Sequence, residues 1–208
     1  MTVVEIITKA QFLSDEEYDN AEWIKLINAC LDDLTPVAKM LTTKENINLA
    51  VVDGGASLSI ASDPDLARAY EIRNIFFTPV DGSTRELKRR ALADNYSPGW
   101  KQTADKLLFQ GLGDNSGTIR VDYYKRLTHV ANINDIPELP VVYHELIVLY
   151  LCAKAQQKEE ELDDKNDFYA EYLRGKQNMA LERIWQMEPE NREMIRNVKV
   201  ISSLGGQG

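Results

Sequence analysis

The sequence has few of the residues from which reactive sites are usually built. Its 208 residues include two cysteines, Cys30 and Cys152, and two histidines, His129 and His144. The cysteines lie far apart in apolar, helix-like stretches and form no CxxC pair. This pattern predicts two buried, reduced thiols rather than a disulfide or a metal site. It fits synthesis in a reducing, cytosolic compartment.

Long apolar runs are also missing. No segment reaches the roughly 20 apolar residues that a helix needs to cross a bilayer. The first twelve residues, MTVVEIITKAQF, have no basic start and no extended apolar stretch. We therefore expect neither a signal peptide nor a membrane anchor, and no membrane partner.

Positive charge is scarce. The 24 Lys and Arg residues face 33 Asp and Glu residues, which gives a formal charge of -9. Because proteins bind phosphates through clustered Lys and Arg, this balance argues against a protein that wraps nucleic acid. One basic cluster interrupts it, in the sequence RELKRR: Arg85, Lys88, Arg89 and Arg90. We interpret the cluster as a solvated helix face paired with nearby acids, and a contact with an acidic partner or DNA phosphates is the alternative.

Motifs for catalysis are absent as well. There is no GxSxG and no phosphate-binding loop, and neither cysteine has an electropositive setting. The pair His144-Glu145 resembles the start of a zinc-binding HExxH, but Val148 stands where the second histidine is needed. We predict no enzyme, cofactor or metal. The alternative is a metalloprotein or enzyme that uses His144, Glu145 and His129.

Helical patterns occupy both ends of the chain. Ser14 followed by Glu17 is a capping-box pattern, which predicts a helix from about Asp15. An apolar stripe from Trp23 to Leu41 continues it, with a kink or break expected at Pro36. Residues 139–155 are apolar on every side, as in a buried central helix, and a further helix is expected over about 164–187.

The middle of the chain has the composition of strands. NLAVVDGGASLSIA and ARAYEIRNIFFTPV are rich in β-forming residues and bounded by turn residues. The sequence STRELKRRALAD predicts a short helix, and residues 106–127 predict a hairpin with its loop at residues 113–117. Within TIRVDYYKRL, Ile119, Val121 and Tyr123 share one face of a half-buried strand.

This order of elements predicts an α+β fold in which a helical bundle carries an inserted β-rich unit of sandwich or barrel type. We assign residues 1–47 and 137–189 to the helical domain, 48–136 to the β-rich domain and 190–208 to an extended tail. The tail is more apolar than a solvated terminus needs, which favours a segment that becomes ordered on a partner. Its apolar residues are Met194, Ile195, Val198, Val200, Ile201 and Leu204.

Several stretches together resemble the connector, adaptor or head-completion proteins that tailed bacteriophages place beneath the portal. They are DNAEWIKLINACLDDL, SPGWKQTADKLLFQGL, TIRVDYYKRLTHV, ELPVVYHELIVLYLCAKA and FYAEYLRGK. The resemblance is strongest from Ser97 to about Lys176 and looser over the first 95 residues.

The resemblance implies a non-enzymatic virion protein at the head-to-tail junction, made in the bacterial host cytoplasm. It implies a ring of twelve subunits that contacts the portal and the next neck or tail protein and lets DNA pass without specific binding. Core roles carry over to Tyr143, Leu146, Ile147 and Tyr150, and strand roles to Tyr123 and Tyr124. Portal contacts carry over to Ile195, Val198, Val200, Ile201 and Leu204. The acidic balance suits a conduit, because a negative wall repels the passing phosphates.

Overall fold

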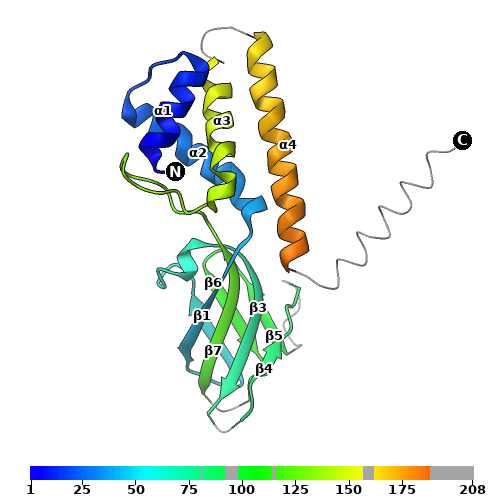
Figure 1. Cartoon of the computed structure of the whole chain (residues 1–208). Coiled ribbons are helices and arrows are strands. Elements are labelled where there is room, and N and C mark those ends of the chain that lie inside the picture. Colours follow the sequence, from blue (N-terminus) through cyan, green and yellow to red (C-terminus); the bar gives the residue numbers. More distant parts are fainter. Residues whose placement is uncertain (81, 92–97, 114–115, 157–161, 188–208) are drawn as a thin grey trace, which may run out of the picture. The chain divides into compact units, whose positions relative to one another are not determined.

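Helices and strands fall into two sets that contact mainly their own members (Figure 1). A computed structural model describes residues 1–80, 82–91, 98–113, 116–156 and 162–187, with side chains in the last range described for residues 167–182. One unit, here the helical unit, comprises Met1–Lys39 and Leu127–Gly208. The other, the β unit, is Met40–Arg126. The predicted α+β class, with a β-rich insertion between helical parts, is confirmed.

The helical unit is organised around its most apolar helix. It contains α1 (Val3–Ser14), α2 (Asn20–Ala38), the short η2 (Val141–Tyr143), α3 (His144–Gln156) and α4 (Leu162–Met187). Helix α3 packs against α1, α2 and α4, so it needs apolar residues on several sides. Leu146 and Ile147 are buried on it, whereas Tyr143 and Tyr150 are half-buried.

The helix boundaries near the N-terminus differ from those expected. The capping box is formed by Thr2 and Glu5 at the start of α1. The predicted helix start near Asp15 is wrong, because Asp15 adopts a left-handed conformation that ends α1. The hydroxyl of Ser14 donates to the carbonyl of Ala10 instead of capping a new helix. Asp19 caps α2 through the amide of Glu22 at 2.7 Å.

Helix α2 also ends earlier than its apolar stripe suggested. Pro36 lies in its last turn, and Lys39 takes a left-handed conformation directly after Ala38. Leu41 therefore belongs to a strand and is 56% exposed, not part of the buried helical stripe. The remaining stripe residues, Trp23, Ile27, Cys30, Leu34 and Ala38, are buried as predicted.

The β unit is a sandwich of two antiparallel sheets. One sheet has the order β1 (Met40–Leu49), β7 (Gly117–Lys125), β3 (Ala69–Pro79) and β4 (Arg85–Leu87). The other has the order β2 (Gly55–Ser59), β6 (Lys106–Gln110) and β5 (Gly99–Gln102), and a single 3-10 turn, η1 (Leu66–Arg68), precedes β3. Side chains from both sheets, including Phe77, Trp100 and Val121, form one buried core.

Strand β7 follows the predicted alternation. Ile119, Val121 and Tyr123 are buried, whereas Arg120 is exposed and Asp122 half-buried. Tyr124 on the opposite face is buried as well, and the guanidinium of Arg73 lies 5.4 Å from its ring.

Two local predictions in this unit are wrong. β6 and β7 form no hairpin, because β6 pairs with β2 and β5 whereas β7 pairs with β1 and β3. The sequence STRELKRR forms no helix, because Arg85–Leu87 pairs with residues 75–77 of β3. The chain stays extended beyond β4, where Trp100 donates to the carbonyl of Lys88. Gly99 permits this approach, since a Cβ there would lie 2.2 Å from that carbonyl oxygen.

Candidate functional site

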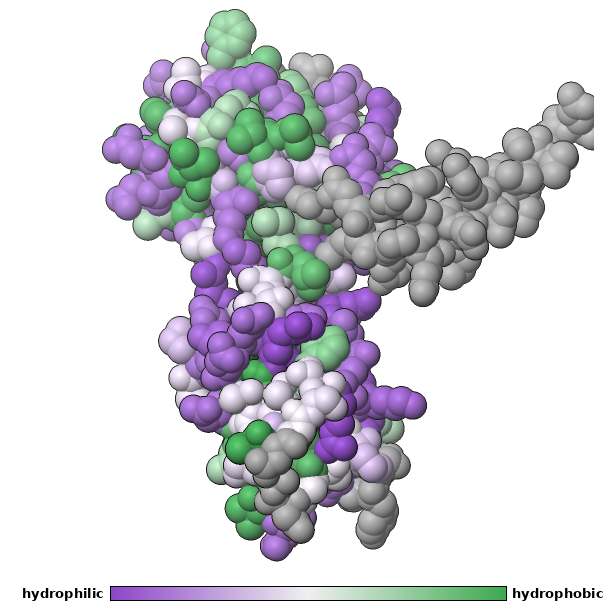
Figure 2. Space-filling model, turned by 60° about the horizontal axis from the view of Figure 1, so that its bottom comes forward, coloured by the Kyte–Doolittle hydropathy of each residue, from purple (hydrophilic) through white to green (hydrophobic). Residues whose placement is uncertain are grey.

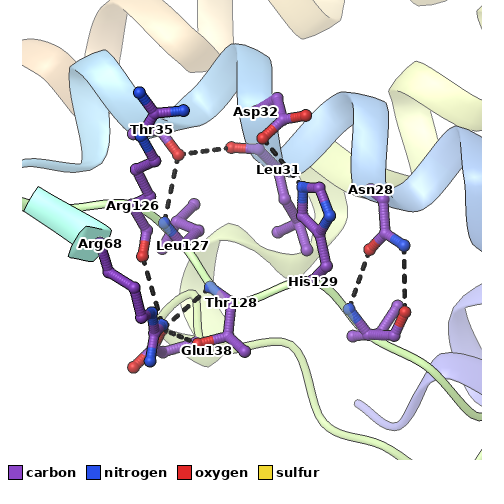
Figure 3. Close-up of polar contacts among 11 residues, drawn as sticks. Asn28, Leu31, Asp32, Thr35, Arg68, Arg126, Leu127, Thr128, His129 and Glu138 are labelled. Carbon is purple, nitrogen blue, oxygen red and sulfur yellow. Dashed lines mark hydrogen bonds and ion pairs between the residues drawn. The ribbon is translucent and has the colours of Figure 1, made fainter. Parts of the chain in front are cut away.

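A row of polar side chains on α2 holds the segment that follows the β unit in sequence (Figure 3). Asn28, Asp32 and Thr35 are spaced by four and three residues, so they lie on one face of the helix. Each contacts a different residue between Leu127 and Val130. We call Asn28, Asp32, Thr35 and residues 127–130 the polar seam.

Asn28 makes the most complete contact of the seam. Its amide nitrogen donates to the carbonyl of Val130 at 3.0 Å, and its amide oxygen accepts the Val130 N–H at 2.8 Å. One side chain thus satisfies both backbone groups, as a neighbouring strand would. Thr35 is 5% exposed and accepts the Leu127 N–H at 3.2 Å while donating to Leu31 O at 2.9 Å. The seam therefore fixes the backbone where the chain returns to the helical unit.

Two carboxylates accept hydrogen bonds from the backbone of residues 128–132. One oxygen of Glu138 accepts both the N–H and the hydroxyl of Thr128, at 3.1 and 2.7 Å. Asp135 accepts the N–H groups of Ala131 and Asn132 at 2.8 Å, and these bonds hold its pKa below the ordinary value. Residues 128–138 thus form a hydrogen-bonded loop.

His129 and His144 have separate partners within the helical unit. His129 lies 2.9 Å from a carboxylate oxygen of Asp32, and both side chains are more than half exposed. His144 is fully buried, with Nε2 2.6 Å from Leu139 O and Nδ1 3.0 Å from the Met1 amino nitrogen. Glu145 pairs with Lys9 at 2.7 Å. Among the described residues, no group of three or more His, Cys, Asp or Glu side chains is placed to hold a metal ion.

Both cysteines are buried thiols. Cys30 is fully buried on α2, and burial raises its pKa far above the ordinary value. Burial likewise raises the pKa of Cys152 on α3 to about 11, and its sulfur lies 3.8 Å from Ala10 O. Because the thiolate is the reactive form, the structure gives neither cysteine the setting of a nucleophile.

A second polar cluster joins α4 to α2. The hydroxyl of Tyr172 donates to one oxygen of Asp33, and the Lys176 ammonium lies 2.7 Å from the other. Partial burial alone would raise the pKa of Asp33, but these two donors outweigh it and lower the pKa. The ring of Tyr172 meets that of Tyr150 edge to face at 5.3 Å. The prediction of a helix over about 164–187 does not by itself indicate these contacts of Tyr172.

The basic cluster lies in the β unit, where its arginines contact their own unit. Arg85 donates to the carbonyls of Gly111 and Leu112 at 3.2 and 3.0 Å. Arg89 lies over the Trp100 ring, and Arg90 is 8% exposed and donates to Gln110 at 2.6 Å. Lys88 is exposed. Three of the four side chains therefore have structural contacts within the sandwich.

Acidic excess is confined to one unit. The β unit contains 12 Lys and Arg against 11 Asp and Glu, a formal charge of +1. The remaining 12 basic and 22 acidic residues belong to the helical unit and give it -10. The total of -9 is therefore the sum of two units with very different charges.

Exposed apolar side chains occur in separate patches, with polar residues between them (Figure 2). In the helical unit the most exposed are Phe12 at 86%, Val142 at 77%, Ile136 and Val141, each at 66%, and Leu181 at 51%. Ile195, Val198, Val200, Ile201 and Leu204, predicted to contact the portal, lie outside the described residues. No helix in the described part of the chain is long and apolar enough to cross a membrane.

Sequence reasoning missed the polar seam. Its signal was present, because Asn28, Asp32 and Thr35 recur at helical spacing on α2. The partner segment gave no comparable signal, since backbone groups accept and donate whatever their side chains are.

Comparison with known proteins places these features in a family. The SU10 adaptor protein family matches residues 1–194, which include both units. A comparison with curated proteins found no match. The match covers far more than half of the chain and indicates a structural adaptor of a phage virion, which acts together with other head or tail proteins. The chain therefore belongs to the SU10 adaptor protein family.

Proposed function

We propose that this adaptor forms a ring of twelve copies beneath the portal and provides a conduit for DNA between head and tail. The family match carries the proposal, because it spans both units and names an adaptor. In this role the chain needs no catalytic residue. The next neck or tail protein is the second partner, on the far side of the ring.

The charge of the helical unit supports a conduit. A wall that binds phosphates would slow the passage of DNA, whereas a formal charge of -10 per copy repels it. We propose that the acidic helical unit forms the wall of the channel. DNA would then pass without a specific contact.

The portal contact falls to the C-terminal segment in this proposal. Ile195, Val198, Val200, Ile201 and Leu204 supply an apolar series that can fill pockets of a partner. The arginines of the basic cluster are assigned no DNA contact, because Arg85, Arg89 and Arg90 already serve the sandwich.

The full chain with the portal ring of the same phage gives the test. Light scattering coupled to size exclusion and negative-stain class averages should show a complex with one closed adaptor ring per portal. Ring closure that occurs only on the portal fits the proposal, because the partner can supply the missing free energy of assembly. A chain that stays monomeric and also fails to bind the portal contradicts it.

The portal-contacting residues are tested by a matched pair of variants. Ile201→Asp should abolish the complex, whereas Ser203→Asp, which adds the same charge at a polar position nearby, should weaken it far less. Equal losses in both variants would show that charge, rather than apolar contact, controls the interaction.

A further inference from the structure

Three aliphatic side chains are exposed where α3 begins and where the described side chains of α4 end. Val141 and Val142 on η2 are 66% and 77% exposed, and Leu181 on α4 is 51% exposed. The hydroxyl of Tyr143 donates to Glu182, so the immediate sequence neighbours of Val142 and Leu181 are bonded to each other. Figure 1 likewise shows the start of α3 beside the C-terminal part of α4. We call Val141, Val142 and Leu181 the η2 patch.

The backbone beneath the two valines is held in place on both sides. The Tyr143 N–H donates to Pro140 O at 2.8 Å, and His144 Nε2 lies 2.6 Å from Leu139 O. Valine has few side-chain rotamers to lose, so a ligand that covers these residues orders little that is not already ordered. Exposed apolar groups on such a rigid support are typical of an interaction site.

The chain itself supplies an apolar segment that can reach the patch. Helix α4 runs on from Glu182 to Met187, a rise of about 7.5 Å, and residues 188–208 follow. From Met187 to Ile195 an extended chain spans up to about 27 Å, more than enough to return. We propose that residues 195–204 of the same chain dock on the η2 patch before the adaptor meets another protein.

Charge favours the same contact. Residues 194–204 carry Arg196 and Lys199 and no acidic residue. Glu182, which accepts the hydroxyl of Tyr143, lies next to the patch, within a unit of formal charge -10. Apolar residues on both sides can therefore meet while the two cations approach carboxylates.

Docking within one chain is favoured over docking between chains. A short linker gives the tethered segment an effective concentration in the millimolar range, above the micromolar concentrations at which such a protein is handled. The contact shields apolar residues that would otherwise associate unspecifically. That a portal would release the docked segment rests on the function proposed above, whereas the intramolecular contact itself does not.

A cross-link in the full chain tests the docking. In Val142→Cys combined with Val198→Cys, mild oxidation should join the two engineered thiols within a monomer, while buried Cys30 and Cys152 stay reduced. The control is Phe12→Cys with Val198→Cys, because Phe12 is 86% exposed but far from the patch. The Met1 amino nitrogen contacts His144, so the start of α1 is the end near the patch, and Phe12 lies nine residues, about 14 Å, along α1 from Val3. The first pair should cross-link at least fivefold faster than the control. Equal rates, or cross-links only between chains, overturn the proposal.

Proteolysis of otherwise unmodified tails gives a second readout. Trypsin can cut the tail after Arg192, Arg196 and Lys199, and docking protects these bonds. Val142→Asp should raise the initial rate of tail cleavage about tenfold, because loss of the apolar contact outweighs the attraction between the new carboxylate and Arg196 or Lys199. Val80→Asp in the β unit, at a valine 75% exposed, should leave the rate unchanged. Unchanged cleavage in Val142→Asp overturns the docking, whatever the outcome of portal binding.

Discussion

Replacing Asn28 by alanine should loosen the polar seam and destabilise the helical unit. The substitution removes both hydrogen bonds to Val130, at 2.8 and 3.0 Å, and leaves the Val130 N–H and C=O without their partner. Val130 is 5% exposed, so water replaces the lost amide only after local rearrangement. The effect should therefore be larger than that of an exposed asparagine.

The magnitude follows from two opposing contributions. Each hydrogen bond contributes about 1 kcal/mol, so the pair contributes about 2 kcal/mol. Alanine is a better helix former than asparagine and returns about 0.5 kcal/mol. The free energy of unfolding should fall by about 1.5 kcal/mol. Asn178→Ala on α4, at an exposed asparagine, is the matched control and should raise stability by about 0.5 kcal/mol.

Urea unfolding followed by far-UV circular dichroism measures the difference. With a slope of about 2 kcal/mol/M, the two variants should differ by about 1 M in midpoint. Hydrogen exchange then locates the effect, because the Val130 amide should lose protection while the Leu127 amide, bound by Thr35, serves as an internal reference. Equal midpoints together with unchanged exchange at Val130 would refute the reasoning.

Three further predictions concern buried or charged groups. The carboxylate of Asp33 has a lowered pKa, so its contribution to stability is complete above the ordinary value of 3.8. This contribution is lost as the pH falls through the lower pKa of the folded state. Asp33→Asn should therefore reduce the pH dependence of the unfolding midpoint in this acidic range. Cys30 and Cys152 should resist iodoacetamide at pH 8 until the protein unfolds, which mass spectrometry of labelled peptides will show. His144→Ala should lower the free energy of unfolding by about 2–4 kcal/mol in urea titrations, because it opens a cavity and removes the bond to a carbonyl; a loss below about 1 kcal/mol would contradict this account.

The buried stripe of α2 could be predicted from spacing alone, whereas the helix boundaries near the N-terminus could not. Trp23, Ile27, Cys30 and Leu34 repeat every three or four residues, and all are buried. The central place of α3 followed from its apolar residues on every side. Such patterns are visible in one sequence because a helix always contacts its core through residues three and four positions apart.

The partners of the strands could not be predicted in the same way. The alternation in β7 identifies a buried face, but it is compatible with pairing to any strand that buries the same face. The Gly-containing connection after β6 suggested a tight hairpin, whereas this connection crosses from one sheet to the other. Sheet assignment depends on contacts between residues distant in sequence, and one sequence carries no record of them.

The basic cluster was misread for a related reason. Arginine has a high intrinsic helix propensity, and RELKRR lacks the alternation of a strand. In the sandwich, Phe77 and Trp100 offer aromatic rings, and the guanidinium groups lie 5.7 and 5.4 Å from their centroids. Tertiary contacts thus override local propensity, which is measured on helices that have no such neighbours.

Charge separation between the units links the fold to the proposed assembly. Helical units of formal charge -10 repel one another when they approach, so ring closure requires either apolar contacts that outweigh this repulsion or a partner that supplies free energy. Salt screens charges over about 10 Å at 0.1 M ionic strength, so association of the isolated adaptor should become easier as salt rises. Apolar docking on a portal should depend less on salt. We therefore expect a ring that closes on its portal at low salt but forms without the portal only at high salt. This result would fit both the charge repulsion between subunits and the apolar docking on the portal.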